Sequence, residues 1–184
     1  MNARGSEGHS TPTASELIAS EDAGWDELHA LMDSLTREET EKPGYYPEGW
    51  SAKDLLAHIG SWLAEAGVFL LRIRVGTYNL EELDIDALNR TFLEIMKDAP
   101  LQTVGAQASA ARARMLLAWG QLPKLTPEAA FWIRKAGAEH YAELCRAFEN
   151  GSWSCVRSPD PQRRRDFRLK ELMSRRRQNS AAAS

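Results

Sequence analysis

The sequence lacks most of the features that mark exported, disulfide-stabilised or nucleotide-binding proteins. Its 184 residues include only two cysteines, Cys145 and Cys155, which is too few for a disulfide framework. The first residues are polar, and no apolar run approaches the roughly 20 residues that cross a bilayer. A glycine-rich phosphate loop and zinc-finger spacings are also missing. We therefore expect a cytoplasmic protein that does not enter a membrane.

Charge is divided unevenly along the chain. The net charge is −3, but residues 151–184 carry nine Lys and Arg against three acidic residues, a net charge of +6 that leaves −9 for the rest. An acidic body is not typical of a nucleic-acid reader, so we expect no nucleic-acid partner. The basic tail has two interpretations. It is either a solvated, disordered end, which its lack of a motif favours, or a segment that contacts phosphates non-specifically.

Strands are not expected, because no segment combines strict apolar–polar alternation with β-branched residues. The class is therefore all-α. Thr13 with Glu16, and Ser51 with Asp54, have the spacing of capping boxes that begin two long helices, the second of which should end at Gly76. The apolar seam of the first helix should consist of Ile18, Trp25, Leu28, Met32 and Leu35.

Two further long helices follow a shorter amphipathic one between residues 80 and 99. The third long helix begins at Leu101, and the alanines in its apolar seam imply a close approach to a neighbouring helix. Thr126 and Pro127 are typical of a helix start, and this fourth helix should continue to about Asn150. Its inward-facing residues should be Ile133, Ala136, His140, Leu144 and Ala147.

These elements predict an antiparallel four-helix bundle, with a short extra helix in the crossing connection between the second and third long helices. We expect the bundle to cover residues 14–150, after a disordered start at 1–13 and before the basic tail at 151–184. Its alanine-rich seam and apolar outer positions permit a homodimer without requiring one.

Two histidines are placed to face the interior of such a bundle. His58 lies three residues after Leu55, at the border of the apolar face of its helix, and His140 lies within the inner stripe of the fourth helix. Imidazoles that project from different helices into one end of a bundle are how bundles build metal sites. An inward histidine is also commonly a structural, hydrogen-bonded residue. Both interpretations stay open on spacing alone.

A family resemblance bears on this choice. The stretch from Gly49 to Ile59, in which Trp50 and Ser51 open a helix that carries His58, resembles the second helix of the DinB-like and mycothiol-dependent maleylpyruvate isomerase superfamily. The segments at residues 86–89, 111–114 and 139–143 also resemble that family, in the same order. The similarity spans about residues 15–150 and implies a DinB-like four-helix bundle.

The resemblance implies a metal site that is only partly present here. Members of the superfamily commonly carry three ligands, one from the second helix and two, four residues apart, from the fourth. His58 matches the first position and His140 one of the pair. Ala136 and Leu144 occupy the two candidate partner positions, and neither binds a metal. A catalytic zinc usually has three protein ligands, so the expected site is one ligand short.

Two glutamates are candidates for the missing ligand. Glu143 is three residues after His140, and Glu65 is seven residues after His58 on the same side of its helix. Both have an ordinary alternative as solvated or arginine-paired surface residues. We expect a divalent ion, zinc or nickel, to be weakly bound or absent.

Other candidates are a thiol and several aromatic side chains. Cys145 is either a nucleophile beside His140 or an inert buried cysteine. Trp62, Trp132 and Tyr141 are candidates to line a substrate site, although aromatic residues at helical spacing commonly pack in the core.

Two functions follow from these residues and the resemblance. The first is a metal-dependent transferase or isomerase that acts with a low-molecular-weight thiol as its partner. The second is a non-catalytic bundle that binds a small molecule or protects against one, which the missing ligand motivates.

Overall fold

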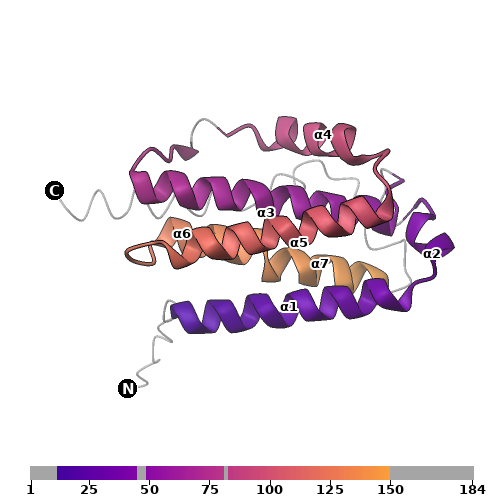
Figure 1. The fold of residues 1–184 in the computed structure, drawn as a ribbon, viewed down its shortest axis with the longest axis horizontal. Coiled ribbons are helices and arrows are strands. Elements are labelled where there is room, and N and C mark those ends of the chain that lie inside the picture. The colour runs from indigo at the N-terminus through magenta and orange to yellow at the C-terminus, as the bar shows by residue number, and fades with distance from the viewer. Residues whose placement is uncertain (1–11, 45–48, 81–82, 150–184) are drawn as a thin grey trace, which may run out of the picture.

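The computed structural model describes residues 12–44, 49–80 and 83–149, and its regular elements there are all helices. No strand occurs within these ranges, so the all-α class is confirmed. The expectations for the chain start and for the basic tail concern residues that lie almost entirely outside these described ranges. The helices (Figure 1) are α1 (Ala14–Ser34), α2 (Arg37–Glu41), α3 (Ala52–Val75), α4 (Ile85–Met96), α5 (Leu101–Gly120), α6 (Pro127–Ala136) and α7 (Ala138–Glu149).

Most helix ends lie where the local sequence predicts them. Thr13 and Ser51 each cap a helix through a reciprocal capping box, and Thr126 caps α6 with Pro127 in the first turn. Gly76 ends α3 in the left-handed conformation, with φ of 75°. The helix starts and the end of α3 therefore follow from local hydrogen bonding.

The first expected helix is interrupted. Leu35 is extended, with ψ of 139°, and Thr36 begins the separate helix α2 through another capping box with Glu39. A threonine that satisfies exposed N–H groups in this way competes with continuation of the preceding helix. The expectation that Leu35 belongs to the first helix is therefore wrong, because α1 ends at Ser34.

The helices α3 and α5 pack closely and run in the same direction. A Cβ added at Gly60 would lie 3.0 Å from Cα of Ala108, and one added at Gly67 would lie 3.5 Å from Cα of Met115. Gly67 lies seven residues after Gly60, and its neighbour Met115 lies seven residues after Ala108, so the two helices run parallel. The connection through α4 returns the chain to the end where α3 began (Figure 1), which corrects the expected antiparallel arrangement for this pair.

The α6–α7 pair runs against α3. The ring of Trp132 in α6 lies 6.2 Å from that of Trp62 and 4.5 Å from that of Phe69, whereas His140 in α7 lies beside His58, nearer the start of α3. The expected single fourth helix is broken at Gly137, whose φ of −100° and ψ of −115° are not helical. The break lies against Glu21 of α1, in a contact described below.

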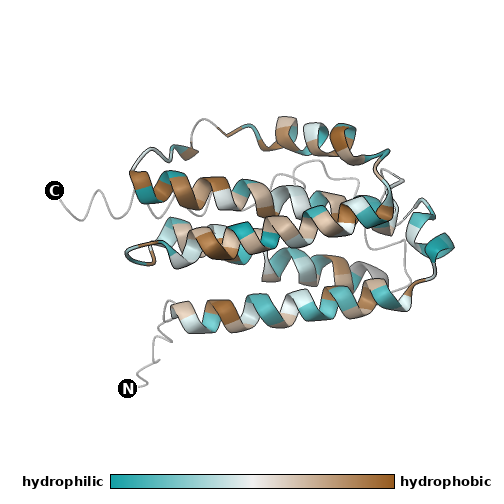
Figure 2. Cartoon of the chain, viewed as in Figure 1, coloured by the Kyte–Doolittle hydropathy of each residue, from teal (hydrophilic) through white to brown (hydrophobic). Residues whose placement is uncertain are grey.

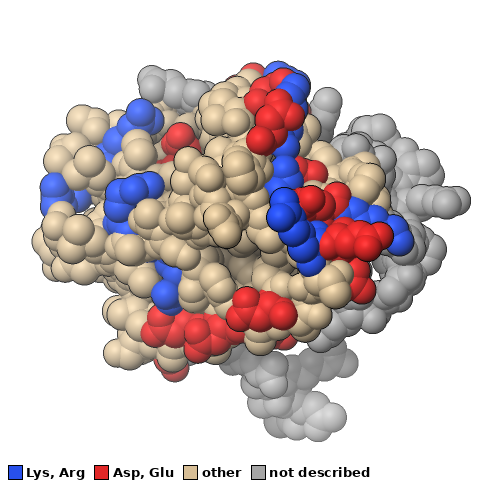
Figure 3. All heavy atoms as spheres, turned by 45° about the vertical axis from the view of Figure 1, so that its right-hand side comes forward, with Lys and Arg blue, Asp and Glu red and all other residues tan. Residues whose placement is uncertain are grey.

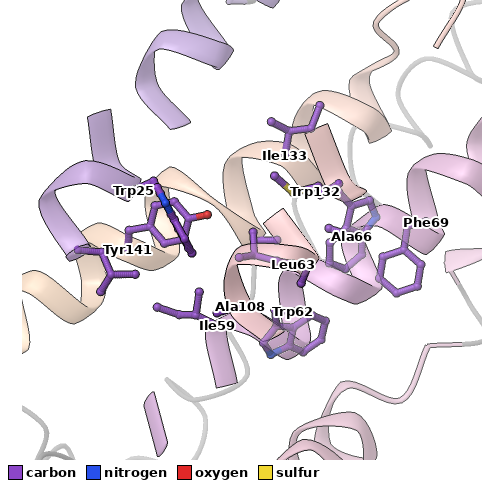
Figure 4. Packing of buried hydrophobic residues seen from close by; sticks show 14 of the residues in the cluster. Trp25, Ile59, Trp62, Leu63, Ala66, Phe69, Ala108, Trp132, Ile133 and Tyr141 are labelled. Carbon is purple, nitrogen blue, oxygen red and sulfur yellow. The ribbon is translucent and has the colours of Figure 1, made fainter. Parts of the chain in front are cut away.

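The core is aromatic-rich and centred on α3. Figure 2 shows hydrophobic residues along α3 and hydrophilic ones over α2, and Figure 4 shows Trp62, Leu63, Phe69 and Trp132 packed together. The seam of α1 differs from the expected one, because Ile18 is 43% exposed whereas Leu17 and the charged residue Glu21 are buried.

One helix in the described part of the chain is long and apolar enough to span a membrane. This helix is α3, which meets the test of length and composition although no such segment was expected from the sequence. Just over half of its most apolar window, 56%, is buried inside the fold. That burial is what a central core helix requires.

Candidate functional site

The side chains of His58 and His140 meet between α3 and α7. The capping box at Ser51 fixes the start of α3, which places His58 two turns into the helix, and His140 lies in the first turn of α7 after the break at Gly137. The two ring centroids are 5.1 Å apart, with an angle of 86° between the ring planes. The imidazoles therefore contact each other edge to face.

Aromatic side chains surround His58. The ring of Trp50 lies 5.1 Å from it and that of Trp62 lies 6.4 Å away. A small pocket beside His58, also lined by Phe92 and Lys97, has a volume of about 10 Å³, which is room for about one water molecule. The surroundings of the histidine pair are thus largely apolar and nearly closed.

Both imidazoles are neutral at physiological pH. Burial lowers the pKa of His58 to about 4, and burial together with the neighbouring His58 lowers the pKa of His140 to about 3. The Nδ1 atom of each ring is buried and has no hydrogen-bond partner, although each residue keeps some exposed surface. Buried polar nitrogens without a partner are uncommon in native proteins, so this pair calls for an explanation.

Among the described residues, no third ligand joins the pair. Within residues 12–44, 49–80 and 83–149, no group of three or more His, Cys, Asp or Glu side chains is placed to hold a metal ion. Glu65 is half-buried on α3, and Glu143 is exposed on α7. Loss of hydration, with a contribution from Glu139, nevertheless raises the pKa of Glu143. Two of the four metal-ligand candidates therefore lie together and the two glutamates do not join them.

The residues considered for substrate binding lie in the core. Trp62, Trp132 and Tyr141 are each at most 1% exposed. The indole nitrogen of Trp62 donates to Oδ1 of Asn89 at 3.0 Å, and that of Trp132 donates to the hydroxyl of Tyr78 at 2.7 Å. These groups hold core side chains in place, and a substrate-binding role for them stays a prediction. Cys145 is likewise buried.

A buried polar cluster next to the histidines was missed by sequence reasoning. We call Glu21, Arg112 and Tyr141 the Glu21 cluster. Arg112 donates from Nε to Oε1 of Glu21 at 2.9 Å and from Nη2 to Oε2 at 2.6 Å, and the hydroxyl of Tyr141 donates to Oε1 at 2.9 Å. Arg112 also bonds Asp22, and its guanidinium lies 5.2 Å from the ring centroid of Trp25. The cluster joins α1, α5 and α7.

The pKa values of two members of this cluster are raised. Burial and the charge of Glu21 raise the pKa of the Tyr141 hydroxyl, which stays protonated. Desolvation alone would lower the pKa of Arg112, but its hydrogen bonds to Glu21 and Asp22 and the charge of Glu21 raise it. The only signal in the sequence was a glutamate four residues after Leu17 and four before Trp25, on the apolar face of α1.

Two surface features lie outside this region. Acidic side chains gather along the lower edge of the molecule in Figure 3, where α1 exposes Asp22, Asp26, Glu27 and Asp33. A groove of about 660 Å³ runs between α3 and α5, and small side chains such as Gly60, Ala64 and Ala111 form most of its wall. Neither feature includes the histidines.

Comparison with known proteins informs the fold more than the activity. No family model matches the sequence, and no curated protein matches it. The fold is similar to the crystal structure of an uncharacterised protein from Escherichia coli UTI89, with a TM-score of 0.64, covering 76% of this chain and 92% of that chain. At 13% identity this similarity concerns the fold alone. Any inference about function therefore depends on the residues of the site.

Proposed function

We propose that this protein is a four-helix bundle of the DinB-like kind whose functional centre is the pair His58 and His140. The order of the helices, the crossing connection through α4 and the Trp50–His58 segment at the start of α3 support the family. The observation that carries the proposal is the 5.1 Å approach of two imidazoles from separate helices, with neither Nδ1 atom hydrogen-bonded.

The pair fits a weakly held divalent ion and does not fit a complete three-ligand catalytic zinc site. Neutral imidazoles are ligands that zinc and nickel accept, and the low pKa values of His58 and His140 keep both rings free of competing protons at neutral pH. The absence of a third side chain in the described residues leaves affinity low and positions open. An external ligand would have to complete the coordination.

The activity that this centre suits is a thiol transfer or isomerisation. A bound divalent ion would supply Lewis acidity that lowers the pKa of a thiol and makes it a nucleophile at neutral pH. His58 and His140 would hold and orient the centre, while Trp50 and Trp62 exclude water from it. A low-molecular-weight thiol is therefore the proposed partner, and the protein is proposed to act as a metal-dependent transferase or isomerase.

A non-catalytic function is the second candidate, and the missing third ligand favours it. In this alternative the bundle binds a small molecule, or protects against one, without using the histidines. It predicts that the substitutions His58→Ala and His140→Ala leave ligand binding unchanged.

Metal titration tests the first candidate. We expect metal-free protein to bind about one zinc or nickel ion per chain in calorimetry, and we expect His58→Ala and His140→Ala each to abolish that binding. Glu128→Ala, a change on α6 outside the site, is the control and should bind as the unmodified protein does. Failure of the unmodified protein to bind either ion would remove the catalytic proposal.

A further inference from the structure

The helix that carries His140 is a separate unit from the helix before it. At Gly137 the backbone leaves helical geometry, so α7 is not a rigid continuation of α6. Their packing differs accordingly, since α6 lies mainly against α3 and α7 lies mainly against α1. Arg134 and Lys135 of α6 pair with Glu139 of α7, so α6 contributes to the position of His140. The direction of His140 relative to His58 on α3 also depends on what α7 itself contacts.

The Glu21 cluster is a buried polar contact that ties α7 to α1 and α5. Tyr141, the residue after His140, donates its hydroxyl to the Glu21 carboxylate, which is itself fixed by three hydrogen bonds from Arg112. Glu21 and Tyr141 are both 0% exposed, so water does not compete for this bond. One buried carboxylate thus ties α7 to α1 and α5 within one residue of the histidine.

Glycines make this contact possible on both sides. A Cβ at Gly24 would lie 3.0 Å from Cδ2 of Tyr141, and a Cβ at Gly137 would lie 3.0 Å from Cγ of Glu21 and 2.7 Å from the carbonyl oxygen of Ile133. The glutamate side chain therefore occupies the space beside the helix break. The break and the cluster form one arrangement.

Because of helical geometry, the hydrogen bond of Tyr141 also fixes the direction of the His140 side chain. Successive residues of an α-helix are about 100° apart around the axis, and the helix turns as a unit. While the Tyr141 hydroxyl stays on Glu21, the side chain of His140 is directed to the α3 side, where it meets His58. If the anchor is lost, α7 can rotate at Gly137 and the two imidazoles separate.

We infer that Glu21 is a positioning residue, which acts through Tyr141 to hold His140 against His58. The importance of this role depends on the proposed histidine centre, but the geometry itself can be measured without any metal. Arg112 fixes the carboxylate and is part of the same device.

The test uses Tyr141→Phe, which removes only the hydroxyl, and Tyr78→Phe as the matched control. The hydroxyl of Tyr78 also takes part in a hydrogen bond to an aromatic residue, Trp132, but Trp132 lies on α6 and not on α7. The first readout is the NMR cross-relaxation peak between the imidazole ring protons of His58 and His140 in metal-free full-length protein. The second is zinc affinity by calorimetry.

We expect the unmodified protein and Tyr78→Phe to show the ring-to-ring peak, and Tyr141→Phe to lose most of its intensity while remaining folded. Zinc affinity should fall roughly tenfold to hundredfold in Tyr141→Phe alone. Glu21→Gln should shift the ring signals of His140 in the same direction as Tyr141→Phe shifts them. If Tyr141→Phe keeps the peak at full intensity, or if Tyr78→Phe loses it equally, the inference is overturned. A protein that binds no zinc but shows the expected peaks refutes the metal proposal and leaves the positioning role in place.

Discussion

Arg112 and Glu21 form a bidentate ion pair between α5 and α1, and the glutamate is fully buried. Removing one partner of a buried pair leaves the other without compensation for lost hydration. We predict that Glu21→Ala lowers the free energy of unfolding by about 3–5 kcal/mol. Urea unfolding followed by circular dichroism measures this change.

The exposed pair of Glu94 and Lys97 provides the comparison for that prediction. Its side chains are 68% and 48% exposed, so solvent screens the interaction. Glu94→Ala should change the free energy of unfolding by less than about 1 kcal/mol. Equal effects of the two substitutions would contradict the account of the Glu21 cluster.

The break between α6 and α7 gives a second prediction. A Cβ at Gly137 would meet the Ile133 carbonyl oxygen at 2.7 Å, so Gly137→Ala forces the neighbours apart and should destabilise the protein by about 1–3 kcal/mol. In α5, a Cβ at Gly105 meets nothing within 4 Å, and Gly105→Ala should stabilise the helix by about 0.5–1 kcal/mol. Thermal unfolding of both variants provides the measurement, and the same sign for both would count against the described geometry.

The histidine pair predicts a loss of stability in mild acid. Burial lowers the pKa of His58 to about 4, and burial with the neighbouring ring lowers that of His140 to about 3, from an ordinary value of 6.5. As pH falls from about 6.5 towards 4, the unfolded chain binds protons that the folded protein does not. The stability contribution of the neutral pair is therefore complete above pH 7 and decreases through this window.

Other groups also titrate in acid, so the contribution of His140 must be isolated. The variant His140→Leu does this, because it lacks the imidazole and keeps the other groups. We expect the difference in free energy of unfolding between pH 7 and pH 5 to be smaller in His140→Leu than in the unmodified protein. Urea unfolding at the two pH values provides the comparison. An equal or larger difference in the variant would show that the histidine is not held neutral.

Local signals in the sequence predicted much of the fold. The capping boxes at Thr13 and Ser51 and the glycine stop at Gly76 depend on neighbours three or four residues away, so they can be recognised without the fold. The breaks at Leu35 and Gly137 were missed. At Gly137 the side chain of Glu21 lies beside the break, and this residue is distant in the sequence and can be placed only when the helices pack.

The candidate site was predictable only in part, for the same reason. Helical periodicity indicates which face carries His58 and His140, and the structure places these two rings together. Helical periodicity cannot reveal a partner such as Arg112, which lies 91 residues after Glu21. Glu21 stands in the apolar seam of α1, and its partner on another helix allows it to be buried.

The central claim is that His58 and His140 belong to one metal-binding centre. Pulsed electron paramagnetic resonance of the protein loaded with one equivalent of copper(II) tests it most directly, because the nitrogen couplings of coordinated imidazoles can be counted. We predict two coordinated imidazoles in the unmodified protein and one in each of His58→Ala and His140→Ala. A spectrum with a single coordinated imidazole in the unmodified protein, or one unchanged by both substitutions, would contradict the account.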